Sequence, residues 1–131
     1  MIHNIYEAVK RVCYLLEKMP NKVEDINDGR YKVLTFNDEK VLVKFTREHF
    51  FSFKKNAHGE SVNTDDLNDA IEQGIKRVFI VYADDKTYMI SPYTIKAQAE
   101  IRRTETEDKE TYSFPIKLLI PIREFQEILI S

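Results

Sequence analysis

The chain is poor in the residues that build disulfides, metal clusters and long loops. Its 131 residues include one cysteine, which excludes an intrachain disulfide and every multi-cysteine zinc or iron–sulfur site. Three glycines and four prolines fall well below the share of roughly 12% found in average proteins. No apolar run approaches the roughly 18 residues of a membrane-spanning helix. The sequence therefore predicts one domain, residues 1–131, in which regular elements follow one another closely.

Neither sign of charge dominates. The net charge is −2, with 32% charged and 43% hydrophobic residues, which is typical of a globular protein. A strongly basic balance, which would indicate a nucleic-acid or membrane-surface partner, is missing. The start of the sequence, residues 1–4, lacks the pattern of a signal peptide. We therefore expect a cytoplasmic protein with no membrane partner. Because glycine-rich phosphate loops and GxSxG motifs are also missing, kinase, P-loop ATPase and serine hydrolase functions are unsupported.

Three segments carry helix signals. Asn4 followed three residues later by Glu7 is a capping pair, and apolar residues then recur at helical spacing up to Pro20. Met19 and Cys13 belong to this apolar stripe, so Cys13 is expected to be a buried, inert thiol.

Two further helices follow later in the chain. Thr64 is expected to cap the second helix, and Gly74 followed by Ile75 has the form of a glycine C-cap with its hydrophobic contact. Ser91 and Pro92 start a short third helix over residues 92–99.

Runs of strand-forming residues alternate with these helices. The polar stretches 21–29 and 56–63 are interpreted as connections, and 101–105 with 111–114 as a polar hairpin. The helix before 78–83 leaves room for a crossover that makes this strand parallel to an earlier one. We predict an α/β fold of three layers, with a mixed central sheet, an antiparallel three-stranded meander and flanking helices, in the order α-β-β-β-α-β-β-α followed by the hairpin and a tail. The expected strands before the hairpin are 30–36, 41–45, 50–55, 78–83 and 87–90.

This element order, over roughly residues 4–90, resembles the core of the restriction-endonuclease-like superfamily, the PD-(D/E)XK nucleases, which includes restriction enzymes and Holliday-junction resolvases. The resemblance implies a site with an acid near the start of the second strand and an acid and a lysine two residues apart on the third. The acids hold Mg²⁺ or Mn²⁺, which generates hydroxide and stabilises charge on the attacked phosphate.

The match to that site is partial. Asp38, or its neighbour Glu39, stands where the first acid belongs, and Glu7 on the first helix is a further candidate metal ligand. Lys54 is the candidate for the lysine that polarises the phosphate, but Ser52 occupies the position of the second acid. The resemblance therefore implies Asp38, Glu7 and Lys54 as catalytic residues, with Asp38 and Glu7 binding metal. Glu48 is a substitute acid.

Strand alternation separates an apolar face from a basic one in the segment 40–55. Lys40, Leu42 and Lys44 share a face with Ser52 and Lys54, with Asp38 at its edge. Several lysines with one carboxylate do not provide the hard oxygen ligands that Mg²⁺ needs, but they suit contact with a phosphate backbone. The expected nucleic-acid-binding residues are Lys40, Lys44, Arg47, Lys54 and Lys55.

Two functions follow from these patterns. The first is a nuclease-like domain that contacts nucleic acid and whose incomplete acids argue against catalysis. The second is a non-enzymatic interaction or assembly module that forms a homodimer through the apolar C-terminal segment, where Phe125, Ile128, Leu129 and Ile130 are concentrated. That segment either completes the core, in part as a short closing helix, or is exposed to a second copy.

Overall fold

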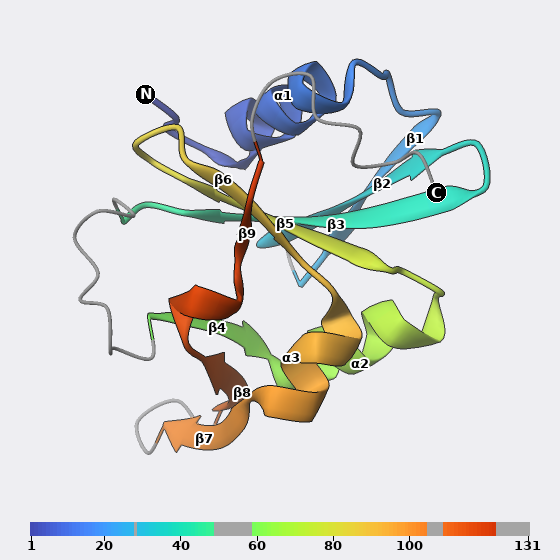
Figure 1. Cartoon of the computed structure of the whole chain (residues 1–131). Helices are drawn as coiled ribbons and strands as arrows, with labels where there is room; N and C mark the ends of the chain where they lie inside the picture. Colours follow the sequence, from blue (N-terminus) through green and yellow to red (C-terminus); the bar gives the residue numbers. More distant parts are fainter. Residues whose placement is uncertain (28, 49–58, 105–108, 123–131) are drawn as a thin grey trace.

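The chain folds into three layers around a mixed β-sheet (Figure 1). The computed structural model describes residues 1–27, 29–48, 59–104 and 109–122. Helix α1 (Ile5–Leu16) covers one face of a six-stranded sheet. The opposite face is covered by helices α2 (Thr64–Glu72) and α3 (Pro92–Gln98) and by a second, three-stranded sheet. The α/β class predicted from the sequence is therefore confirmed.

The larger sheet has one parallel pair of strands. Its strand order is β1-β2-β3-β5-β6-β9, and all neighbours are antiparallel except β3 and β5. Val41 lies opposite Arg77, and Thr46 lies opposite Tyr82. Because the chain passes through α2 between these strands, the expected crossover and parallel pairing are confirmed. The strands are β1 (Lys22–Ile26), β2 (Tyr31–Phe36), β3 (Glu39–Thr46), β5 (Arg77–Tyr82), β6 (Thr87–Ile90) and β9 (Ile120–Pro121).

The smaller sheet lies against α2 and α3. It has the order β4-β8-β7, and its antiparallel β7–β8 pair is the hairpin predicted at 101–105 and 111–114. A 3-10 helix, η2, then leads back to the larger sheet. The bounds are β4 (Glu60–Asn63), β7 (Glu100–Thr104), β8 (Lys109–Phe114) and η2 (Ile116–Leu118).

The larger sheet is apolar on both faces. On the α1 side, Val43 and Phe79 pack in one cluster with residues of the helix, and on the other side Leu42 and Ile80 pack with α2, α3 and the smaller sheet. Five of the six residues of β5 are buried, which agrees with its lack of alternation. The sheet is therefore an internal layer, and functional surfaces must lie at its edges or ends.

Two polar stretches that were predicted to be connections contain strands. The stretch 21–29 holds β1, and the stretch 56–63 holds β4, so the antiparallel meander is β1-β2-β3. Both strands are short and rich in charged or polar residues. Strand β1 lies at an edge of the larger sheet, and β4 alternates between buried and partly buried positions. The predicted strand 50–55 lies outside the described residues. Strand β3, its expected partner, is paired with β2 on one side and β5 on the other.

Helix α1 starts as predicted but ends early. The Asn4 side chain accepts a hydrogen bond from the Glu7 amide at 2.9 Å, which confirms the capping pair. The helix ends at Leu16, and the next residue, Glu17, adopts a left-handed conformation with φ 54°. The chain therefore leaves the helical stripe before Met19, whose expected burial is wrong: it is 83% exposed.

The caps of α2 differ from the prediction at one end only. Asn63, not Thr64, is the N-cap, and its side chain accepts from the amides of Asp65 and Asp66. At the other end Gly74 has φ 79°, its amide donates to Ile71, and the amide of Ile75 donates to Ala70. These two bonds form the predicted glycine C-cap, and Ile75 is fully buried.

Replacing the cap residue should destabilise the fold. Asn63→Ala removes the side-chain oxygen that accepts from two helix amides at this end, so we expect a loss of about 1 kcal/mol in the free energy of unfolding by urea. Asn63→Ser keeps a capping oxygen and serves as the matched control, with a loss of a few tenths of a kcal/mol at most expected. Equal stability of Asn63→Ala and the parent would show that this cap is not formed.

Candidate functional site

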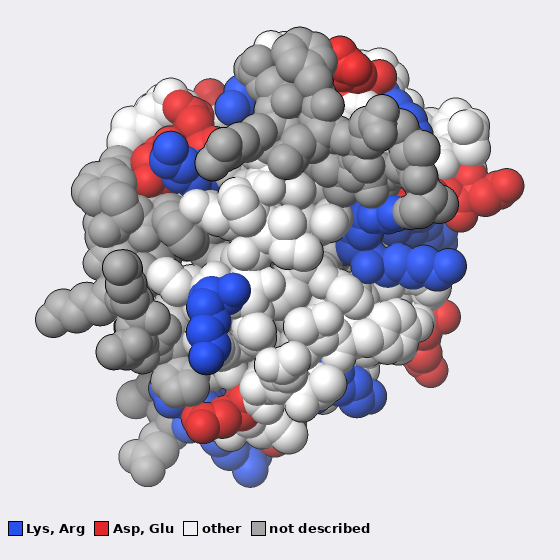
Figure 2. All heavy atoms as spheres, viewed as in Figure 1, with Lys and Arg blue, Asp and Glu red and all other residues white. Residues whose placement is uncertain are grey.

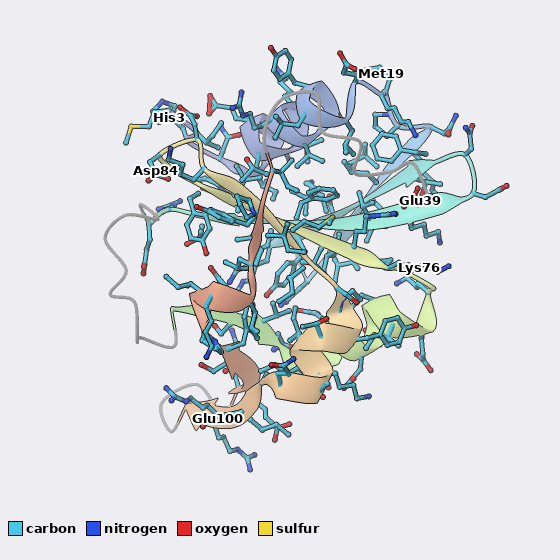
Figure 3. All side chains as sticks on the ribbon, in the orientation of Figure 1. His3, Met19, Glu39, Lys76, Asp84 and Glu100 are labelled. Atoms are coloured by element: carbon cyan, nitrogen blue, oxygen red, sulfur yellow. The ribbon has the colours of Figure 1, made fainter. Side chains whose placement is uncertain are left out.

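The two acids expected to bind metal lie at opposite ends of the larger sheet. Asp38 is exposed in the turn before β3. Glu7 lies in the first turn of α1, where its carboxylate accepts from the His3 amide at 2.6 Å. Figure 3 shows His3 near Asp84, which follows β5, whereas Glu39, the first residue of β3, lies on the other side of the molecule. Because β3 and β5 are parallel, the structure does not bring Asp38 and Glu7 together.

The substitute acids do not complete this site among the described residues. The Glu39 carboxylate forms an ion pair with Arg77 of β5, and burial lowers the pKa of that guanidinium. Glu48 is exposed after the other end of β3. Within residues 1–27, 29–48, 59–104 and 109–122, no three His, Cys, Asp or Glu side chains are grouped so that they could hold a metal ion.

The basic residues predicted to contact nucleic acid are also separated. Lys40 is half-buried near the start of β3, and Arg47 is exposed just after its end. Lys54 and Lys55 lie outside the described residues. On the face shown in Figure 2, basic side chains occur in separate groups with acidic and uncharged residues between them. The described part of the chain therefore presents no single basic stripe on this face.

Lys44 is held in a partly buried polar cluster between the two sheets. Its ammonium pairs with the carboxylate of Glu60 and donates to the Ser61 carbonyl at 2.5 Å. The side chain of Glu60 is 4% exposed and that of Lys44 is 16% exposed. The second oxygen of Glu60 accepts from the Tyr82 hydroxyl at 2.7 Å. The cluster thus joins β3 and β5 of one sheet to β4 of the other.

The electrostatics of this cluster favour the neutral form of its tyrosines. Burial raises the pKa of Tyr82, and the nearby charge of Glu60 raises it further. Burial also raises the pKa of Tyr31, an effect that the positive charge of Lys44 partly offsets. Tyr82 therefore remains a hydrogen-bond donor at neutral pH. Both carboxylate oxygens of Glu60 accept hydrogen bonds from other strands, so the cluster links the two sheets.

The corrected strand order changes how the sequence aligns with the nuclease pattern. With β1-β2-β3 as the meander, β3 is its third strand and Lys44 takes the position of the lysine. Leu42 stands two residues before it, where the pattern has an acid, and is fully buried in the core. Glu60, which Lys44 does contact, was missed because its segment was interpreted as a connection. The sequence of β4, ESVN, has no local signal for the burial of Glu60, because the partners of this carboxylate come from other strands.

An apolar groove lies between the outer face of α1 and the edge strand β1. Its volume is about 700 Å³. Met19 lies beyond the end of α1, on the outside of the molecule (Figure 3). Lys10, Glu17 and Lys18 supply the charged part of the lining. We call this surface the α1–β1 groove; its apolar lining consists of Val9, Cys13, Tyr14, Met19, Pro20 and Val23.

Cys13 is the single thiol of the chain and lines the α1–β1 groove. It is half-buried, and burial raises the pKa of its thiol. A raised pKa keeps the sulfur protonated near neutral pH, which suits a packing residue and not a nucleophile. Its place in the groove makes it a useful reporter of whether that surface is covered.

The comparisons with known proteins leave the family open. Searches of protein-family models, curated proteins and solved structures found no match to this chain. No helix in the described ranges is both long and apolar enough to cross a membrane. Function must therefore be argued from the surfaces themselves.

Breaking the Lys44–Glu60 pair should strongly destabilise the protein. Glu60→Gln leaves the Lys44 ammonium without its counter-charge in a mostly buried position, so we expect a loss of about 3 kcal/mol in urea unfolding. The double variant Lys44→Leu with Glu60→Leu removes both charges and should recover part of that loss. If Glu60→Gln is as stable as the parent, the pair does not join the sheets as described.

Proposed function

We propose that this protein is a non-enzymatic assembly module, and that the α1–β1 groove of one copy receives the apolar C-terminal segment, residues 123–131, of a second copy. The observation that carries the proposal is the groove itself, an apolar surface of about 700 Å³ beside an edge strand. Three large apolar side chains of its lining, Tyr14, Met19 and Val23, are exposed, and exposed apolar side chains that lie next to one another favour contact with another molecule.

The sequence of the segment suits this groove. Phe125, Ile128, Leu129 and Ile130 provide apolar side chains, and Glu124 and Glu127 provide negative charge. The groove offers the complementary combination of an apolar floor and two lysines, Lys10 and Lys18.

The segment begins on the other side of α1 from the groove. The described chain ends at Ile122, which is buried next to β9 and lines a pocket with Arg11 of α1, whereas the groove lies between α1 and β1. We propose the groove of a second copy as the contact, which predicts a dimer that depends on protein concentration. Contact of the segment with the groove of its own chain predicts a monomer.

Sedimentation velocity over a range of protein concentrations tests the assembly. We expect the parent chain to form a dimer, and a chain ending at Ile122 to be a folded monomer, because Ile122 and β9 are retained. Met19→Glu places a charge in the groove at a residue that is already exposed, and should also give a monomer. The matched control is Tyr93→Glu on α3, which is 54% exposed outside the groove and should leave the dimer intact.

Alkylation of Cys13 separates this surface from other modes of dimerisation. If the segment covers the groove, Cys13 should react several-fold more slowly in the parent than in the chain ending at Ile122, measured at the same pH. A parent that is monomeric at all concentrations contradicts self-association. A dimer in which Cys13 reacts at the same rate as in the truncated chain contradicts the groove as its contact surface.

A nuclease-like domain that contacts nucleic acid is the second proposal. Its support is the resemblance in element order and the basic side chains expected at the surface, of which Arg47 is exposed in the described part. The oxygen ligands for Mg²⁺ or Mn²⁺ are separated as described above, so we propose backbone contact without cleavage.

The second proposal can be tested by fluorescence anisotropy. Labelled duplex, branched and single-stranded DNA are titrated with the protein at low and moderate salt, with Mn²⁺ present. Phosphate contact predicts micromolar binding that weakens steeply with salt, whereas apolar assembly persists. If binding is seen, Arg47→Gln should weaken it, and any cleavage should be lost in Asp38→Asn. Lack of binding at low salt would exclude a nucleic-acid contact.

A further inference from the structure

A second pocket lies on the other side of α1, where the helix faces the turn between β5 and β6. Its volume is about 340 Å³, within the range of pockets that hold small molecules. Arg11 lines it from α1, Lys86 from the turn before β6, and Thr87 from the first position of β6. Ile122 closes it next to β9. This pocket shares none of its lining residues with the α1–β1 groove.

Arg11 places an unused donor at this pocket. Its guanidinium lies over the ring of Tyr14, 5.7 Å from the centroid, and forms no ion pair with a carboxylate among the described residues. The Nε atom is shielded from solvent and has no hydrogen-bond partner in the same part of the chain. A buried donor without an acceptor is unfavourable, so an acceptor brought by a ligand would stabilise it.

Thr87 contributes a second unused polar group. The residue is 4% exposed, and its hydroxyl has no hydrogen-bond partner within the described residues. Thr87 lies directly opposite Val81, which packs on the α1 side of the sheet, and paired residues project from the same face. The hydroxyl therefore faces the side on which Arg11 lies. The Thr87 carbonyl accepts from the Ile122 amide at 2.9 Å, which fixes this wall of the pocket.

The described lining of the pocket has more positive than negative side chains. Asp85 is the acidic residue in its lining, and its carboxylate lies 3.4 Å from the amino group of Met1. The described lining thus has two positive side chains, Arg11 and Lys86, and one carboxylate, that of Asp85. A planar guanidinium, an ammonium and a hydroxyl around one small cavity are the groups that recognise the oxygens of a phosphate.

We propose that this pocket binds the phosphate group of a small phosphorylated molecule. The Arg11 guanidinium, including Nε–H, and the Thr87 hydroxyl donate to phosphate oxygens, and Lys86 contributes its charge at the exposed rim. The site is distinct from the groove of the proposed assembly, because the two surfaces share none of their described lining residues.

This site can be tested by isothermal titration calorimetry and by thermal unfolding. Both are done with inorganic phosphate and with glycerol phosphate, at constant ionic strength. We expect both to bind and to raise the melting temperature. Arg11→Gln should weaken binding about tenfold or more, which is the loss of a charge-assisted contact. Thr87→Val, which keeps the shape and removes the hydroxyl, should weaken it several-fold. Lys96→Gln on α3, an exposed position outside both this pocket and the α1–β1 groove, is the control and should bind like the parent.

Each outcome decides the proposal. Circular dichroism of each variant without ligand shows whether the variant folds. If Arg11→Gln does not fold, Lys86→Gln replaces it, because Lys86 is at an exposed position. An acetate response equal to that of phosphate would contradict a phosphate site. Phosphate binding that is unchanged in both Thr87→Val and Lys86→Gln would also contradict the proposed site. Binding of glycerol phosphate but not inorganic phosphate would identify an ester as the ligand and support the proposal.

Discussion

The arrangement of the two sheets depends on one carboxylate. Glu60 of β4 receives the ammonium of Lys44 from β3 and the hydroxyl of Tyr82 from β5, so it contacts the parallel pair at both of its strands. In a mostly buried position these contacts are much stronger than at a surface, and each partner is needed by the others. The smaller sheet and its hairpin are thereby attached to the larger sheet at one defined place, while apolar packing supplies the rest of the contact.

Most of the fold could be predicted because its signals are local. The Asn4–Glu7 cap, the glycine C-cap at Gly74 and the apolar run of β5 are all read within a few neighbouring residues. The two missed strands, β1 and β4, carry polar residues for reasons that a local pattern does not show. An edge strand needs to bury only one side, and Glu60 is polar because its partners come from other strands.

The candidate sites were harder to predict because they depend on contacts between distant parts of the chain. Alternation correctly puts Lys40, Leu42 and Lys44 on one face of β3, but that face is covered by the smaller sheet, so Lys44 meets Glu60. Asp38 and Glu7 were combined by their place in a family pattern, and the parallel strands separate them. The pocket for which we propose phosphate binding combines Arg11 of α1 with Lys86 and Thr87 at the start of β6, and no spacing in the sequence brings these together.

The two edges of the larger sheet are unequal, and this has a consequence for symmetry. At one edge β9 is two residues long and includes Pro121, which has no amide hydrogen, whereas at the other β1 is a five-residue strand beside the groove. A contact from the β9 edge of one molecule to the β1 edge of the next joins different surfaces. Contacts between different surfaces close when two molecules exchange segments about a twofold axis or when the rotation from one molecule to the next closes a ring, and otherwise they propagate as an open filament. In the assembly proposed above, the direction in which the chain leaves Ile122 relative to the β1 edge would therefore decide between a closed oligomer and a filament.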